Sequence, residues 1–282
     1  MHEFLSDLQN QPFLQYALLT GVLASIACGI IGSYVVTRRI TYIAGAIAHS
    51  ILGGMGAARY LEVIHRWDWL HPIYGAVAAA LASAIIIGLV SLGAKQREDT
   101  VIGAVWAIGM ALGILFIFKT PGYNEDLMSY LFGNILMVSV GDLWLIAELD
   151  VLIVVVGLLF YNQLLAVCFD EEFARIRGIH VEFYYLLLLC LTALTVVLLV
   201  TVVGIVMVIA LLTLPVAVAG HFSKRLWHMM ALATIFSAVF TTLGLTLSYG
   251  PDLPAGATTI LLAGAVYLAV ALGGRLMRWR RS

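Results

Sequence analysis

The chain has 282 residues, of which 62% are hydrophobic and only 11% are charged, and its formal net charge is −1. Soluble domains carry roughly 25% charged residues, so a chain this apolar cannot keep a soluble surface. A net charge near zero also gives no basis for nucleic-acid binding, which depends on clustered positive charge. The composition therefore predicts an all-α integral membrane protein that lies in the lipid bilayer.

Apolar stretches long enough to cross a bilayer as helices, about 20 residues each, recur along the chain. They lie at 13–37, 41–61, 72–94, 101–118, 143–166, 180–201, 203–222, 226–248 and 256–275. A shorter amphipathic segment, 125–141, is predicted to be a periplasmic or re-entrant helix. The sequence thus predicts one permease-like domain, 1–282, that is a polytopic bundle of about nine transmembrane helices, with eight as the alternative.

Basic residues are distributed unequally between the two ends of these stretches. Of the 15 lysines and arginines, only Arg59, Arg66 and Lys119 fall on one side, and the other twelve fall on the opposite side. Short loops rich in Lys and Arg stay in the cytoplasm. The side with twelve basic residues is therefore predicted to be cytoplasmic, together with the C-terminus, and nine spans would place the N-terminus outside.

The second apolar stretch carries a histidine, His49, behind the arginine pair Arg38-Arg39. An ionisable side chain at membrane depth is costly and marks a functional site by default. Its neighbours, among them Gly45 and Gly53, are small enough for water or an ion to reach the imidazole. We expect His49 to lie on a transport pathway; the alternative is a histidine that is satisfied by helix packing.

Carboxylates gather toward the predicted outer face. Glu148 and Asp150 lie near the outer end of the fifth stretch, and Asp126 lies in the segment before it. An acidic mouth concentrates cations, so these three residues are candidates for a cation pathway. The alternative is that they mark only where the helices meet water.

The cytoplasmic loop after the fifth stretch has the charge order of a short helix. It opens on acids, continues to an arginine and ends on a glycine: Asp170, Glu171, Glu172, Arg175 and Gly178. Acids near the N-terminus and bases near the C-terminus complement the helix dipole, and glycine is favoured just after the C-terminus. The pattern predicts a helix near 169–178 that is either interfacial or a docking element for a soluble partner.

Proline is rare in this chain, and one of the six prolines, Pro215, lies inside the stretch 203–222. Proline has no backbone N–H and its ring collides with the preceding turn. We therefore expect Pro215 to break or kink this helix. Broken helices line pathways in many transporters, so Pro215 is a candidate for a gating role. The alternative is that it serves only in packing.

Six motifs occur in a fixed order along most of the chain. They are Arg38-Arg39 with Ile43 to Ser50, Asp99 to Gly103 with Ala111 to Gly113, Asp126 to Leu136, Asp170 to Gly178, Val203 to Pro215, and Asp252 to Thr258. Together they resemble the metal-type permeases of bacterial ABC importers, which carry zinc, manganese or ferrous iron. The resemblance implies the fold of a type II ABC importer permease.

The same resemblance implies partners and a location. Such permeases form homodimers in the inner membrane of the bacterial cell, two cytosolic ABC ATPase subunits dock on their coupling helices, and a periplasmic or surface metal-binding protein delivers the ion. Asp170 to Gly178 falls where the family has its coupling helix. The chain has no P-loop of its own, so we expect a transporter subunit rather than an enzyme. No permanently bound cofactor is expected, because the divalent metal ion is the cargo.

Two positions depart from the family pattern. Gly45 stands where the family has an aspartate four residues before the histidine, and Asn134 stands where it has the aspartate of a Leu-Phe-Gly-Asp signature. Residues four apart share one face of a helix, so Gly45 removes half of the expected ion site and leaves His49. Because imidazole suits zinc and manganese prefers oxygen ligands, zinc is the expected cargo, with manganese or iron(II) as the alternatives.

A stand-alone secondary transporter is a further alternative. Proton coupling would need a buried carboxylate at mid-span, and no acid falls in the middle third of any predicted stretch. A sensor or scaffold protein would need a soluble module, and the loops are too short for one.

Overall fold

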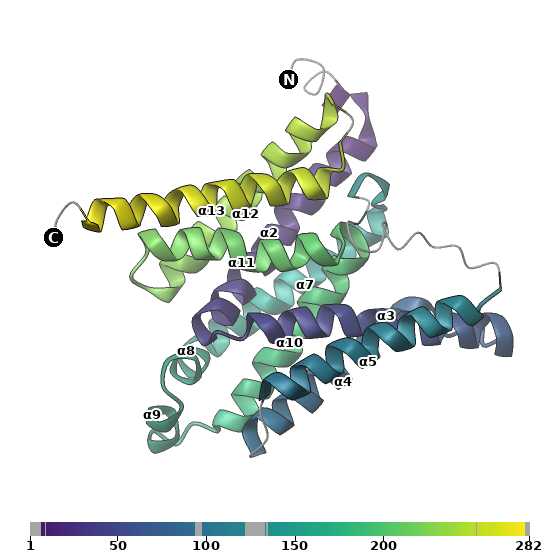
Figure 1. Ribbon diagram of the computed structural model, residues 1–282, viewed down its shortest axis with the longest axis horizontal. Coiled ribbons are helices and arrows are strands. Elements are labelled where there is room, and N and C mark those ends of the chain that lie inside the picture. The colour runs from purple at the N-terminus through teal and green to yellow at the C-terminus, as the bar shows by residue number, and fades with distance from the viewer. Residues whose placement is uncertain are drawn as a thin grey trace. The chain divides into compact units, whose positions relative to one another are not determined.

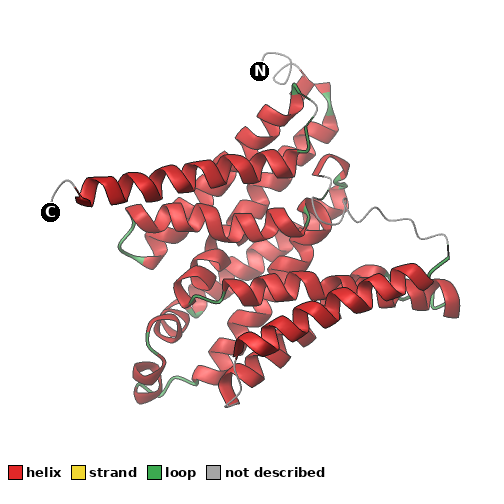
Figure 2. Cartoon of the chain, viewed as in Figure 1, coloured by secondary structure: helices red, strands yellow, loops and turns green. Residues whose placement is uncertain are grey.

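The computed structural model describes residues 7–8, 10–93, 98–121, 133, 135–251 and 253–279, and every regular element in these ranges is a helix (Figure 2). The predicted all-α class is therefore confirmed. In chain order the helices are α2 (Pro12–Arg38), α3 (Thr41–His65), α4 (Pro72–Gly93), α5 (Glu98–Lys119), the 3₁₀ turn η1 (Ile135–Met137), α7 (Val140–Leu159), α8 (Tyr161–Phe169), α9 (Glu171–Ile176), α10 (Val181–Val203), α11 (Ile205–Phe222), α12 (Leu226–Tyr249) and α13 (Ala255–Trp279).

Within the described residues, seven helices are long and apolar enough to cross a membrane, or eight if the pair α7 and α8 is one span. The prediction of about nine spans was therefore too high, and its alternative of eight agrees with the upper count. The difference is α3, which forms as a helix of 25 residues but is not among the candidate spans. Its glycines, its histidine and the pair Arg59 and Glu62 make it less apolar than its neighbours.

The chain divides into two compact units. Unit 1 comprises Met1–Val36, Met128–Leu159 and Leu199–Ser282, and it contains most of α2 together with α7, α11, α12 and α13. Unit 2 comprises Thr37–Leu127 and Phe160–Leu198, and it contains α3, α4, α5, α8, α9 and most of α10. Each unit is described separately below.

Unit 1 is held together where small residues let helix backbones approach. A Cβ atom on Gly32 of α2 would lie 2.5 Å from the carbonyl oxygen of Leu212 on α11. A Cβ atom on Gly244 of α12 would lie 2.7 Å from the Cα atom of Thr259 on α13. Helices in lipid associate through close van der Waals packing rather than through the hydrophobic effect, so these glycines are structural.

Pro215 does not break its helix. The helix α11 runs from Ile205 to Phe222 with the proline inside it, and the Pro215 side chain is buried. Proline removes only the one backbone hydrogen bond that its N–H would donate to the carbonyl four residues earlier, and the helix continues for seven residues beyond it. The expected break is therefore absent.

Unit 2 is built around α3, which packs against both α4 and α5, and Figure 1 shows these three helices side by side. A Cβ atom on Gly54 would lie 2.1 Å from the carbonyl oxygen of Gly75 on α4, and one on Gly53 would lie 2.8 Å from that of Gly109 on α5. The two neighbouring glycines therefore bring α3 into backbone contact with both helices. This packing fixes the position of His49, one turn earlier on α3.

Candidate functional site

The side chain of His49 is held by an aromatic ring. His49 is half-buried on α3, and its imidazole stacks on the indole of Trp106 from α5, with ring centroids 4.4 Å apart and planes 15° from parallel. The stacking covers one face of the imidazole and leaves its ring edge, where both nitrogens lie, outside the stacked pair. The histidine can therefore pack against α5 and still offer a nitrogen to an ion.

Gly45 lies one helical turn before His49 on the same face, and Trp106 contacts both positions. A Cβ atom at position 45 would meet the Cζ3 atom of the Trp106 indole at 3.4 Å, which is ordinary van der Waals contact. The indole therefore occupies part of the space that a longer side chain at position 45 would need. Sequence reasoning missed Trp106, because a single tryptophan in an apolar helix carries no signal of what it stacks on.

No closed metal site is formed by the described residues: no three His, Cys, Asp or Glu side chains among them come close enough together to hold an ion. His49 therefore offers one imidazole that belongs to no cluster of three such side chains among these residues. A single ligand binds a divalent ion weakly, and weak binding lets an ion leave a transport pathway again.

A cavity of about 540 Å³ lies in unit 2, lined mainly by small and apolar side chains of α3, α4 and α5, and His49 is not among its lining residues. Ser50 and Ser83 contribute hydroxyls to its wall, and these two hydroxyls are hydrogen-bonded to each other at 2.8 Å. Because the lining is apolar and its two serines are already paired, the cavity offers no ligand set for an ion.

Asp150 lies at the middle of α7, where it is the eleventh of 20 residues. Its side chain is buried with 5% exposure, and neither carboxylate oxygen has a hydrogen-bond partner among the described residues. The sequence placed Asp150 near the outer end of a stretch that continues to residue 166, whereas α7 ends at Leu159 and has Asp150 at its middle. A carboxylate that is buried without a hydrogen-bond partner is costly to the fold.

Glu148 does not share a site with Asp150. Its side chain is exposed, whereas that of Asp150 is buried, since residues two apart on a helix point to different sides. The remaining predicted acid, Asp126, and the departing position Asn134 lie outside the described residues.

The cytoplasmic loop contains the helix α9, Glu171–Ile176. Asp170 caps its N-terminus by accepting a hydrogen bond of 2.9 Å from the backbone N–H of Phe173. Glu171 and Glu172 lie in its first turn, and the chain turns away at Gly178, whose φ of +77° suits glycine. The capping acid, the order of the charges and the glycine each take the place that the sequence pattern indicates.

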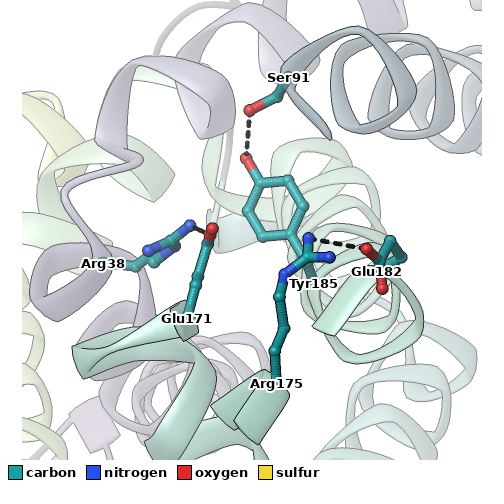
Figure 3. A network of polar contacts seen from close by, with 6 residues as sticks. All are labelled: Arg38, Ser91, Glu171, Arg175, Glu182 and Tyr185. Carbon is teal, nitrogen blue, oxygen red and sulfur yellow. Dashed lines mark hydrogen bonds and ion pairs between the residues drawn. The ribbon is translucent and has the colours of Figure 1, made fainter. Parts of the chain in front are cut away.

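Both ends of α9 are tied to other parts of unit 2 by ion pairs, which Figure 3 shows. At its start, the Glu171 carboxylate pairs with the guanidinium of Arg38. At its end, the Arg175 guanidinium lies 2.7 Å from the Glu182 carboxylate at the start of α10. The helix is six residues long, too short to be stable alone, so these contacts hold it in place.

One face of α9 carries large apolar side chains that are exposed, although the Arg177 guanidinium lies over the Phe173 ring, with its Cζ atom 5.1 Å from the ring centroid. Phe173 is 49% exposed and Ile176 is 84% exposed, whereas Ala174 on the opposite side is fully buried. Exposed apolar groups that cluster beside polar ones mark surfaces for a protein partner or a membrane.

Comparison with known proteins places the chain in one family. The sequence model of a family described as "ABC 3 transport family" matches residues 10–273. A probable metal transport system membrane protein of Chlamydia trachomatis is 43% identical over 256 residues, which cover 91% of this chain and 87% of that protein. The manganese transport system membrane protein MntC of Listeria monocytogenes is 34% identical, with coverages of 94% and 91%.

A solved structure has a fold similar to that of this chain. PsaBC from Streptococcus pneumoniae, determined in complex with Fab, superposes with a TM-score of 0.83 at 32% identity and covers 95% of this chain and 94% of that chain. The similarity extends over nearly the whole chain in both sequence and structure.

Proposed function

The chain belongs to the ABC 3 transport family, and from this premise we propose that it is the membrane permease of an ATP-driven importer for a divalent metal ion. The observation that carries the proposal is His49, a metal-binding side chain on a glycine-packed helix in a multi-pass protein of this family. Its half-buried imidazole stacks on Trp106 and keeps its nitrogens at the ring edge. A neutral imidazole in that setting binds a transition-metal ion without holding it permanently.

We propose manganese as the cargo. The expectation of zinc rested on the single imidazole left by Gly45, but MntC of Listeria monocytogenes, 34% identical over nearly the whole chain, is named for manganese. Manganese prefers oxygen ligands, and the chain supplies carboxylates on α7 at Glu148 and Asp150. Of these two carboxylates, the buried Asp150 is the one that we propose as an ion ligand in addition to His49, because the exposed Glu148 points to another side of α7.

The assembly follows from the same premise. We propose a homodimer in the bacterial inner membrane, with cytosolic ATPase subunits docked on α9 and a periplasmic or surface metal-binding protein on the opposite side. The exposed Phe173 and Ile176 support the docking position, since an apolar helix face seats well in a groove of a partner. In this arrangement Asp170, Glu171, Glu172, Arg175 and Gly178 shape the docking helix and contribute no ligand to the ion.

The function is tested by ATP hydrolysis in the assembled complex of this chain, its ATPase subunits and its binding protein in lipid nanodiscs. We expect the loaded binding protein to stimulate hydrolysis, with manganese giving a larger stimulation than zinc at equal free concentration. A larger stimulation by zinc would identify zinc as the cargo, and the chain would still be the permease of an ATP-driven metal importer. No stimulation by manganese, zinc or iron(II) would contradict the proposed function.

Replacing Asp150 with asparagine separates a transport role from a packing role. An unpaired buried carboxylate destabilises the fold, so Asp150→Asn is expected to raise the free energy of unfolding by about 1 to 3 kcal/mol. At the same time it removes an oxygen ligand with negative charge, so metal uptake is expected to fall about tenfold or more. Thermal unfolding in detergent and uptake by cells measure the two effects. A stabilised variant with full uptake would remove Asp150 from the pathway.

A further inference from the structure

Arg38 contacts two elements that are far apart in the sequence. It is the last residue of α2, and its guanidinium forms the ion pair with Glu171, the first residue of α9. The same guanidinium lies over the ring of Tyr185 on α10, with its Cζ atom 5.4 Å from the ring centroid. Figure 3 shows Arg38 and Glu171 facing each other beside this ring.

The ring behind Arg38 is firmly placed. Tyr185 is one of the most buried large side chains, with 1% exposure, and its hydroxyl lies 3.3 Å from the hydroxyl of Ser91 on α4. A planar guanidinium can stack on an aromatic face and pair with a carboxylate at the same time, which the ammonium of lysine does poorly. Arg38 is therefore held in one orientation, with Tyr185 on one side and Glu171 on the other.

Arg38 is also only three residues from the start of α3. The chain turns at Arg39, which has a positive φ of 63°, and α3 begins at Thr41 after the cap Ile40. His49 follows eight residues later, which is about 12 Å along a helix at 1.5 Å per residue. Arg38 therefore lies between Glu171 and the beginning of the helix that carries His49.

We propose that Arg38 is a positioning residue that transmits movement of α9 to α3 and thereby couples ATP hydrolysis to the state of the His49 site. The inference rests on the proposed function, because α9 moves in this way only if an ATPase subunit docks on it. The ion pair is partly exposed, with 23% and 32% of the two side chains accessible, so its contribution to stability is small. Its importance lies in connecting two elements, because networks of ion pairs and packed side chains carry energetic coupling between sites.

The experiment compares Arg38→Gln with Arg39→Gln in the complete complex in proteoliposomes. Arg39 is the matched control, because it is the adjacent residue, has the same charge and is exposed. We expect Arg38→Gln to lower the number of metal ions imported per ATP hydrolysed by about fivefold or more, the lower end of typical allosteric coupling. Arg39→Gln is expected to leave this ratio unchanged. The ATPase subunits should co-purify with both variants.

Two further variants make the outcome decisive. Arg38→Glu and Glu171→Arg are each expected to lower the number of metal ions imported per ATP hydrolysed. Combining the two restores an ion pair of opposite polarity and is expected to recover part of that loss. Arg38→Lys keeps the charge but loses the fit to both partners, so an intermediate ratio is expected; this variant also serves if Arg38→Gln does not assemble. Three results would each overturn the inference. The first is an equal ratio of ions to ATP for Arg38→Gln and Arg39→Gln, and the second is an equal ratio for Arg38→Lys and wild type. The third is no recovery of the ratio in the double exchange. Absence of ATP-dependent uptake by the wild-type complex would instead contradict the proposed function.

Discussion

Replacing His49 with alanine is expected to reduce metal uptake by about tenfold or more at unchanged expression, since even residues that only support a metal ligand change affinity or activity by about 10- to 100-fold. The variant removes the imidazole that the structure places on the interior of unit 2, stacked on Trp106. Uptake of radioactive manganese by cells that depend on this importer measures the effect.

His49→Phe is the matched variant that separates the two interpretations of this histidine. Phenylalanine keeps an aromatic ring against Trp106 and so preserves stacking, which is worth about 0.5 to 1.5 kcal/mol, but it has no nitrogen to offer a metal. If His49 lies on the pathway, His49→Phe loses uptake as His49→Ala does. If His49 only packs between α3 and α5, His49→Phe transports normally, and this result would contradict the pathway assignment.

The second large effect is expected at the docking helix. Phe173→Ser combined with Ile176→Ser removes the exposed apolar face of α9 without changing its capping or its ion pairs. Anchor side chains at interface centres contribute about 2 kcal/mol or more each, so the loss of two is expected to lower the affinity for the ATPase subunit by about 700-fold. Co-purification and titration of the ATPase subunit with the permease in nanodiscs measure this loss.

Phe118→Ser provides the control for that experiment. Phe118 is 90% exposed near the end of α5, beside Lys119 on the side that the basic residues predict to be outside. The substitution removes a comparable apolar surface and is expected to leave ATPase binding unchanged. Normal binding by the double variant of α9 would show that the subunits dock elsewhere.

The sequence predicted those parts of the molecule that local interactions determine. Helix α9 is the clearest example, because the capping acid Asp170, the order of charges and Gly178 are all encoded within ten residues of one another. The long helices follow from apolar length in the same way. The family resemblance, which rested on ordered motifs, is confirmed by the match over residues 10–273.

The features that sequence reasoning missed depend on contacts between distant segments. Trp106 meets His49 only because glycines let α3 and α5 approach, and Arg38 meets Glu171 across more than a hundred residues. The arginine pair was interpreted as part of the basic cytoplasmic side and of the first family motif, and nothing in its local sequence indicates a partner. Asp150 was misplaced for a related reason: α7 ends at Leu159, where apolar residues continue and composition gives no boundary.

Uptake of manganese by proteoliposomes distinguishes an ATP-driven importer from a stand-alone carrier. We expect this chain, assembled with its ATPase subunits and supplied with loaded binding protein, to import manganese only when ATP is present on the side of the ATPase. The chain reconstituted alone should import none, with or without a proton gradient. Uptake by the chain alone, driven by a proton gradient and lost in Asp150→Asn, would contradict the account and identify a stand-alone carrier.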